Sequence, residues 1–389
     1  MRSNKRKLVL VVSSNRSDYG LLEPLMKQLI SEKEINFGLI VTGSHLLKKF
    51  GFTFNDINPK IQRKAVAKIK VLESTSKTTM IKNTGYLIEK FSSIFKKLKP
   101  DLVILLGDRY EIFSAATSCH LLQIPLTHIH GGEVTSGALD DGFRHSITKF
   151  SDLHFTSSVA HRKRVIQLGE HPRKVFNVGP MVLDNFLNLK FLSKTELQKK
   201  LKISRAKKDF LVCFHPETIG NENNLETLNN LIIKIKEYKE YNFIFTASNN
   251  DPGGDKLNSA IKKNVKIYDN FYFFDSLGSQ LYYSLLHCCD GLIGNSSSGI
   301  IESPLFQKFS LNIGSRQEGR EKTRYTIDCG ISAAQIERGL KNLFIKSNKA
   351  IKSKIKYESP SKLIVNKLKE KLFGKLEKNK LFHDIKNLM

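Results

Sequence analysis

The chain has 389 residues, which is enough for two domains that each bury a core of their own. A hydrophobic content of 40% and a charged content of 26% are typical of globular proteins and exclude a largely disordered chain. No window approaches the roughly 18 consecutive apolar residues that a membrane span requires, so no membrane partner is expected.

The formal net charge of +26 raises the question of nucleic-acid binding. Much of this charge comes from lysines spread over predicted helices and over the C-terminal stretch KLKEKLFGKLEKNK. Compositional drift produces the same pattern, and the sequence shows no zinc finger, aromatic RNA-binding signature or basic recognition helix. We therefore interpret the charge as solvated surface and expect no nucleic-acid partner.

The N-terminus places basic residues before an apolar run, as a signal peptide does. That run covers only residues 8–12, and no small-residue cleavage site follows it, so we expect a buried strand in a cytoplasmic protein. The five cysteines are scattered without a CxxC spacing, which predicts neither a disulfide framework nor a zinc site.

Short apolar runs alternate with amphipathic stretches through the first half of the chain, as in the βαβ units of a parallel sheet. The predicted strands cover residues 7–12, 37–41, 67–71, 101–106, 125–129, 153–156 and 175–178. The predicted helices cover residues 21–31, 80–97, 109–122, 142–150 and 159–167.

A second series of the same kind begins near residue 210. Its predicted strands cover residues 210–214, 242–245, 265–268, 291–294 and 309–313, and its helices cover 224–238, 253–262, 276–287, 298–303 and 334–345. The predicted fold is α/β, with two Rossmann-like doubly wound domains at residues 1–178 and 206–355. A polar, helical linker at 179–205 separates them, and a Lys-rich helical segment follows at 356–389. Parallel sheets bind ligands at the carboxyl ends of their strands, so the active site is expected in a cleft between the domains.

Two segments of the first domain place a charged residue at the end of a predicted strand. The turn SSNRSDYG follows the first strand and lacks both common glycine-rich phosphate-binding patterns. Its Arg16 can bind a phosphate or carboxylate bidentately, or form a surface salt bridge. In LLGDRYE, Asp108 follows a very apolar strand, where a carboxylate points into a ligand crevice; alternatively, it caps the next helix.

The densest group of titratable residues lies in THIHGGEVTSGALDDGFRHSITK. It comprises His128, His130, Glu133, Asp140, Asp141, Arg144 and His145. Gly131–Gly132 permits a sharp turn close to a ligand, and Asp140 or Asp141 would cap the following helix. So many charges in one loop favour acid–base chemistry over a purely structural role.

The pair of His128 and His130 also permits a metal-dependent hydrolase. In barrel hydrolases such a pair usually follows the first strand, whereas here about four strands precede it. The second half of the chain also lacks a further set of His and Asp residues at strand ends. No metal site is therefore expected.

The second domain carries candidate groups for a nucleotide diphosphate at its strand ends. Backbone N–H groups in GLIGNSSSGIIE lie at a predicted helix N-terminus, which is a site for an anion, and a glutamate one turn later can accept both hydroxyls of a ribose. The loop NIGSRQEGRE adds arginines as phosphate counter-charges. The candidate residues are His215, Asn249, Ser296, Ser297, Glu302, Arg316 and Arg320.

Taken in order, seven motifs resemble those of the hydrolysing UDP-N-acetylglucosamine 2-epimerases, over roughly residues 7–330. They are SNRSDYG, TGSHL, LGDRYE, HIHGGEVTSGALDDGFRHSITK, FHPET, GNSSSGIIE and GSRQEGRE. The resemblance implies a GT-B-like pair of Rossmann domains, with a C-terminal helix that crosses back to the first domain. It also implies a homo-oligomer, dimeric or tetrameric, that uses neither a metal nor a redox cofactor.

The resemblance further implies a reaction on a UDP-linked N-acetyl sugar. The enzyme removes the C2 proton and expels UDP to give a glycal, and water then adds with C2 inverted. The free sugar, of the N-acetylmannosamine type, serves sialic-acid or legionaminic-acid biosynthesis. The substrate is accordingly UDP-N-acetylglucosamine or a UDP-2,4-diacetamido-6-deoxy sugar, and the sequence does not separate the two.

Motif by motif, the resemblance places Asp108 and Asp140 on catalytic carboxylates of the family. It places on UDP-binding positions Arg16, His215, Asn249, Ser296, Ser297, Glu302 and Arg316. Relatives that read HIEGG or HVEAG carry a glutamate where this chain has His130. We expect His130 to hold the third acid/base position, with Glu133 as its rival.

Three other functions are compatible with the fold. A non-hydrolysing 2-epimerase would return a UDP-linked product, and a GT-B glycosyltransferase would need an acceptor and would leave the loop around His130 without a role. A non-enzymatic binding protein would bind ligand without turnover.

Overall fold

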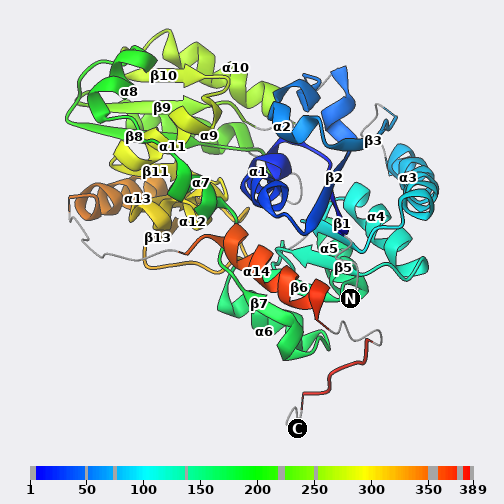
Figure 1. Cartoon of the computed structure of the whole chain (residues 1–389). Coiled ribbons are helices and arrows are strands. Elements are labelled where there is room, and N and C mark those ends of the chain that lie inside the picture. The colour runs from blue at the N-terminus through cyan, green and yellow to red at the C-terminus, as the bar shows by residue number, and fades with distance from the viewer. Residues whose placement is uncertain are drawn as a thin grey trace. The chain divides into compact units, whose positions relative to one another are not determined.

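The computed structural model describes residues 6–48, 51–72, 77–135, 139–217, 224–248, 253–348, 358–374 and 380–385. The chain divides into two compact α/β units (Figure 1). Unit 1 comprises Met1–Leu187 together with Tyr357–Met389, and unit 2 comprises Asn188–Lys356.

Unit 1 is built on a seven-stranded parallel sheet with the order β3-β2-β1-β4-β5-β6-β7. The strands are β1 (Lys7–Ser13), β2 (Ile35–Thr42), β3 (Ala65–Ile69), β4 (Leu102–Leu106), β5 (Leu126–Ile129), β6 (Leu153–Thr156) and β7 (Val175–Asn177). The helices are α1 (Arg16–Ser31), α2 (Pro59–Gln62), α3 (Lys77–Leu98), α4 (Tyr110–Leu121), α5 (Leu139–Phe150), α6 (Val159–Gln167), α7 (Val182–Asn188) and α14 (Pro360–Phe373). The central strands β1 and β4 are continuous apolar runs because helices cover both faces of the sheet.

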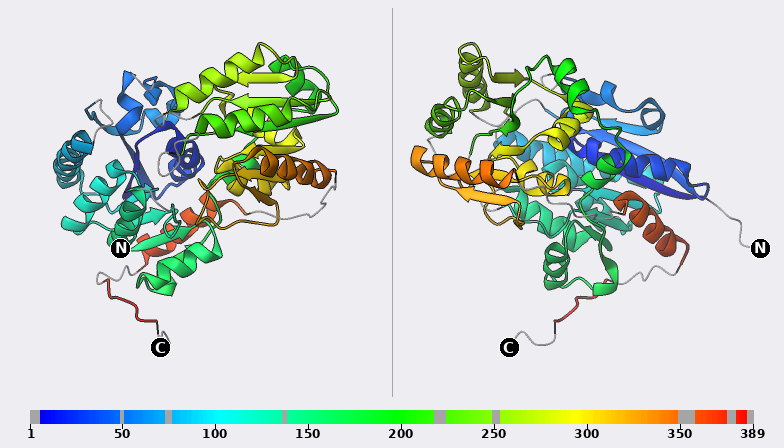
Figure 2. Two further views of the ribbon diagram at one scale, coloured as in Figure 1. Left: turned by 180° about the vertical axis from the view of Figure 1, so that it is seen from behind. Right: turned by 90° about the vertical axis from the view of Figure 1, so that its left-hand side faces the viewer.

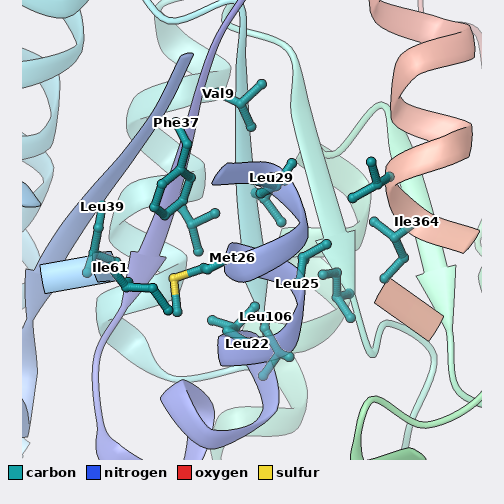
Figure 3. Close-up of a cluster of buried hydrophobic side chains, with 14 of the residues drawn as sticks. Val9, Leu22, Leu25, Met26, Leu29, Phe37, Leu39, Ile61, Leu106 and Ile364 are labelled. Atoms are coloured by element: carbon teal, nitrogen blue, oxygen red, sulfur yellow. The ribbon is translucent and has the colours of Figure 1, made fainter. Parts of the chain in front are cut away.

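The two faces of this sheet carry separate hydrophobic layers. On one face, α1 buries Leu22, Leu25, Met26 and Leu29, a spacing that gives a helix one apolar side (Figure 3). On the other face, α3, α4 and α5 pack over the opposite side chains of the same strands. Figure 2 shows α1 and α14 on the side of the sheet away from α3.

The C-terminal helix α14 belongs to unit 1 and packs along α1. Its Ile364 joins the hydrophobic layer under α1 (Figure 3). The buried carboxylate of Asp184 in α7 fixes the start of α14, because it accepts hydrogen bonds from the Ser361 backbone N–H at 2.8 Å and from the Ser359 and Ser361 hydroxyls. The expected return of the C-terminal helix to the first domain is confirmed.

Unit 2 is built on a six-stranded parallel sheet with the order β10-β9-β8-β11-β12-β13. The strands are β8 (Lys208–Cys213), β9 (Tyr241–Thr246), β10 (Phe271–Phe274), β11 (Gly291–Gly294), β12 (Ser310–Ile313) and β13 (Thr326–Cys329). The helices are α8 (Lys194–Leu201), α9 (Asn224–Ile235), α10 (Gly254–Val265), α11 (Gly278–Cys288), α12 (Ser298–Ile301) and α13 (Ala333–Lys346). Its core is rich in phenylalanine, and Phe210 stacks on Phe243 with ring centroids 6.0 Å apart.

The sequence places one strand of unit 2 incorrectly. Residues 265–268 are not a strand, because Val265 ends α10 and extends the apolar side formed by Leu257 and Ile261. The strand follows as β10, whose aromatic run pairs in parallel with β9. The edge strand β13 is not predicted by the sequence pattern; it is only half-buried and pairs with β12.

All five cysteines are free thiols, and Cys119, Cys213 and Cys289 are buried. Among the described residues, no helix combines the length and the apolar character needed to cross a membrane.

Candidate active site

Asp108 stands at the carboxyl end of the sheet of unit 1. It follows β4 and Gly107, whose N–H donates to the Ile129 carbonyl at 3.2 Å and so keeps the ends of β4 and β5 together. The side chain of Asp108 is 22% exposed and pairs with the Arg144 guanidinium of α5. Arg109, not Asp108, is the N-cap residue of α4, and no side chain caps that helix, so the alternative cap role of Asp108 is wrong.

Arg144 joins three segments around Asp108. Its side chain is only 6% exposed, and its Nη1 donates to Asp141 Oδ1 at 3.2 Å and to Thr135 Oγ1 at 3.3 Å. The Thr135 backbone N–H also donates to Asp141 Oδ1, at 2.9 Å. Asp140 and Asp141 lie inside the first turn of α5, not before it, so the expected capping role is wrong for both. Asp140 is exposed there and interacts electrostatically with Arg109.

His128 is a core histidine. It is fully buried, its Nε2 donates to the Gly107 carbonyl at 2.8 Å, and its Nδ1 lies 3.0 Å from the Thr148 hydroxyl. Burial lowers its pKa to about 3, so the ring is neutral. Both ring nitrogens are thus engaged within the protein, and in the part of the chain that the structure describes no three His, Cys, Asp or Glu side chains are grouped for a metal ion.

His130 and Glu133 meet at the ends of β5 and β6. His130 has a left-handed backbone (φ 65°), and its N–H donates to the Phe155 carbonyl at 2.9 Å. Its Nε2 accepts from the Met181 N–H at 3.1 Å, and its Nδ1 lies 3.4 Å from Glu133 Oε1. Ser157 also donates to Glu133 Oε1, at 2.8 Å. The sequence predicts His130 and Glu133 as candidates. It does not predict Ser157, which lies after the motif HIHGGEVTSGALDDGFRHSITK.

The end of β1 adds two groups. Arg16 is the first residue of α1 and is exposed, while the Asn15 side chain caps the helix through the Asp18 N–H. Burial raises the pKa of Asp18 to about 6, against the charge of Arg109 and hydrogen bonds from Ser14 and Asn15. Arg109 forms a two-pronged ion pair with the buried Glu111. Asp18 is a group that sequence reasoning missed, although it lies within the motif SNRSDYG.

In unit 2, Asn295 locks the ends of β8 and β11 together. Its amide accepts from the His215 backbone N–H at 2.7 Å and donates to the His215 carbonyl at 2.8 Å. The preceding Gly294 (φ 136°) is required, since a Cβ there would lie 2.0 Å from the Cys213 carbonyl oxygen. Burial, together with the charge of Arg316, lowers the pKa of His215 to about 4.

Arg316 lies beside the same strand ends. Its Nη1 donates to the Asn295 carbonyl at 3.2 Å, and its backbone N–H donates to Glu217 Oε1 at 3.1 Å. The buried Gln317 donates to the Asn295 carbonyl at 2.8 Å. The structure therefore brings together His215 and Arg316, as the sequence predicts. Their supports Asn295, Glu217 and Gln317 lie within the quoted motifs but were not singled out.

The serine loop after β11 leads into the short helix α12. Ser296 Oγ accepts from the Ser298 N–H at 3.3 Å, and Ser297 is the N-cap residue. Glu302 follows α12, where its Oε1 accepts from the Tyr283 hydroxyl at 3.1 Å, and burial raises its pKa. Arg320 lies in the loop after β12, and its backbone N–H donates to the Gln317 carbonyl at 3.4 Å. Asn249 lies outside the described residues.

These features define the class of protein. Two Rossmann-like units, with a cluster of titratable side chains at the strand ends of one and basic and N–H groups at the strand ends of the other, are typical of enzymes that act on nucleotide-containing substrates.

Comparison with known proteins agrees with this class. The family model for UDP-N-acetylglucosamine 2-epimerase matches residues 27–364. The chain is 40% identical over 331 residues to the GDP/UDP-N,N'-diacetylbacillosamine 2-epimerase (hydrolyzing) of Campylobacter jejuni, covering 85% of each protein. It is 39% identical to the polysialic acid biosynthesis protein P7 of Escherichia coli, over 86% of this chain and 85% of that one. It is 31% identical to the UDP-N,N'-diacetylbacillosamine 2-epimerase (hydrolyzing) of Legionella pneumophila, over 90% of this chain and 91% of that one.

Solved structures show the same fold. The UDP-GlcNAc 2-epimerase of Neisseria meningitidis, crystallised with UDP-GlcNAc, matches with a TM-score of 0.76 at 17% identity, over 93% of this chain and 99% of that one. The chain belongs to the UDP-N-acetylglucosamine 2-epimerase family. The family, the enzymatic class and the pair of Rossmann-like domains expected from the sequence are confirmed.

Proposed function

We propose that this chain is a hydrolysing 2-epimerase that converts a UDP-linked 2-acetamido sugar to UDP and the free, C2-inverted sugar. The observation that carries the proposal is the group at the ends of β4 and β5, where Asp108 pairs with the buried Arg144 and Glu133 lies beside His130. The family and the hydrolysing relatives support the same reaction.

The reaction needs proton transfer at two stages. A base removes the C2 proton as UDP departs, and an acid and a base then add water across the glycal that results. In this proposal, Asp108, Asp140 and a third group at His130 or Glu133 perform these transfers. Arg144 orients Asp108 through their ion pair, and each well-placed acid/base group contributes about 10²–10⁴ to the rate.

Unit 2 binds the nucleotide in this proposal. The diphosphate gains negative charge as it leaves, so the groups that bind it also stabilise the transition state. His215, Arg316 and the loop of Ser296 and Ser297 meet it, with Arg16 as a further cation. Glu302 binds the ribose, and Asn249 belongs to the same set.

The substrate is one of two UDP-sugars. Two of the relatives are named for UDP-N,N'-diacetylbacillosamine and one for polysialic acid biosynthesis, which supports a UDP-2,4-diacetamido-6-deoxy sugar and UDP-N-acetylglucosamine respectively. The proposal includes action in the cytoplasm, in legionaminic-acid or sialic-acid biosynthesis, as a homo-oligomer of two or four chains.

Separate incubation with the two UDP-sugars tests the proposal. Chromatography of the products should show UDP and a free sugar in equal amounts from one of them, without any acceptor, and Asp108→Asn should remove this activity. A UDP-linked epimer as the product would instead indicate a non-hydrolysing enzyme. Turnover only with an added acceptor would indicate a glycosyltransferase.

A further inference from the structure

The loop that carries Glu133 is fastened to α6. Gly132 (φ 81°) approaches this helix so closely that a Cβ would lie 2.4 Å from the His161 carbonyl oxygen. The Gly132 carbonyl in turn accepts a hydrogen bond from Arg164 of α6. The backbone just before Glu133 therefore has little freedom to move away from α6.

Two side chains from this region hold the Glu133 carboxylate. Ser157, between β6 and α6, donates to Glu133 Oε1 at 2.8 Å, and His161 Nδ1 lies 2.8 Å from the Ser157 oxygen. A serine hydroxyl has one proton. Because that proton goes to Glu133, the bond between His161 and Ser157 must be donated by His161 Nδ1–H. Ser157 is thus itself held in the direction of the carboxylate.

His130 is held in a way that suits a donor to Glu133. Its Nε2 accepts from the Met181 N–H at 3.1 Å, so a neutral ring carries its proton on Nδ1. That nitrogen faces Glu133 Oε1 at 3.4 Å. His130 therefore cannot take a proton from a substrate through Nε2 unless it first loses the bond to Met181. The carboxylate of Glu133, with side-chain exposure of 15%, differs from the ring nitrogen because its two oxygens offer several lone pairs, so it can accept a proton while Ser157 still donates to Oε1.

We propose that Glu133 is the third acid/base group of this site, and that Ser157 and His161 are positioning residues that hold its carboxylate. This inference rests on the proposed function, because it assigns a role within that reaction. A proton-transfer group that is aimed by fixed neighbours gains rate from its orientation, whereas substrate affinity depends little on it. The contribution of Ser157 should therefore be seen in kcat and only through Glu133.

Steady-state kinetics with the full-length enzyme test this assignment. Glu133→Gln should lower kcat by at least about 10², and Ser157→Ala by about 10-fold, with KM unchanged in the second variant. Ser157→Thr retains a hydroxyl and should stay close to the wild-type rate. The double variant Ser157→Ala/Glu133→Gln should be no slower than Glu133→Gln alone, since Ser157 acts through the carboxylate. Ser31→Ala, an exposed serine at the end of α1, is the matched control.

Two outcomes would overturn the assignment. Wild-type kcat in Glu133→Gln would remove the carboxylate from the reaction, and multiplying effects in the double variant would show that Ser157 contributes independently of it. A further pair of variants tests the role of His161. The amide of His161→Asn can still donate to Ser157, so this variant should have a higher kcat than His161→Ala, which has no donor.

A measurement without substrate separates this inference from the proposed function. Nitrogen-15 NMR of histidine-labelled protein should show the Nδ1–H tautomer at His130 and at His161. The Nε2–H tautomer at His130 would contradict the assignment even in an active enzyme. Failure of the wild type to consume either UDP-sugar would refute the proposed function, whereas the tautomers would still decide how Glu133 is held.

Discussion

Buried polar side chains at the strand ends support the groups that we assign to chemistry. Arg144 ties Asp108 to the start of α5, and His128 ties the Gly107 carbonyl to α5 through Thr148. In unit 2, Asn295 performs the same task for His215. Each of these three side chains makes hydrogen bonds to backbone or charged groups inside the protein. Removal of the side chain would leave a buried polar group without its hydrogen bond.

At the scale of single residues, Asp108→Asn and Asp140→Asn should each lower kcat by at least about 10² while UDP binds as before. The amide keeps the size of the side chain but cannot accept a proton. Stopped assays of UDP release and calorimetric titration with UDP check both parts, with Ser146→Ala on the exposed side of α5 as the control. Wild-type kcat in both variants would refute their catalytic role.

His215→Ala and Arg316→Ala should weaken UDP binding instead. Loss of a hydrogen bond to a charged group costs about 1.5–3 kcal/mol, which corresponds to a rise in Kd of roughly 10- to 100-fold. Arg338→Ala, at an exposed position of α13, is the matched control. Titrations that match the wild type would remove the two residues from the nucleotide site.

At the scale of elements, the end of α5 depends on a segment far along the chain. Lys380 donates to the carbonyl oxygens of Lys149 and Ser151 and forms a 2.8 Å ion pair with the buried Glu170. Cations at a helix C-terminus complement its partial negative charge. The helix that carries Asp140 and Arg144 is therefore anchored at its other end by Lys380.

Lys380→Met should accordingly lower the free energy of unfolding by about 1–3 kcal/mol, because it leaves the carbonyl oxygens and Glu170 without this donor. Urea unfolding at neutral pH measures the change. Lys362→Met, an exposed lysine of α14, should have little effect. Equal stability of the two variants would show that the contact does not hold α5.

The sequence predicts most elements because both sheets use strongly apolar central strands between amphipathic helices. It fails at 265–268, where Val265 fits a helical side as well as a strand, and at β13, whose residues are half-exposed. The motifs predict which loops carry the candidate site. The pairs Arg144–Asp108 and Asn295–His215 are separated by 36 and 80 residues, and their contact depends on helix position and strand register that no local pattern contains.

At the scale of the whole molecule, the structure holds several histidines neutral. Burial lowers the pKa of His45 to about 4 and that of His128 to about 3. It also lowers the pKa of His154, and burial together with the charge of Arg316 lowers the pKa of His215. The unfolded chain binds these protons near pH 6.5, so below that pH it gains more protons than the folded protein does. Asp18, whose pKa is raised to about 6, offsets part of this effect, as does Glu302.

Stability should therefore fall as the pH drops from 6.5 towards 4, by up to about 1.4 kcal/mol per pH unit for each net proton. Urea unfolding at pH 7.5, 6 and 5 measures the trend. His45→Gln should reduce the slope between pH 6.5 and 4. A free energy of unfolding that does not change over this range would contradict the neutral state of the buried rings.

The most direct test of the central claim is NMR of the reaction in D₂O with each UDP-sugar in turn. The account predicts that one substrate gives UDP and a free mannosamine-type sugar that carries deuterium at C2, because the C2 proton is removed and replaced from solvent. A free sugar that retains its original C2 proton, or a product still attached to UDP, would contradict it.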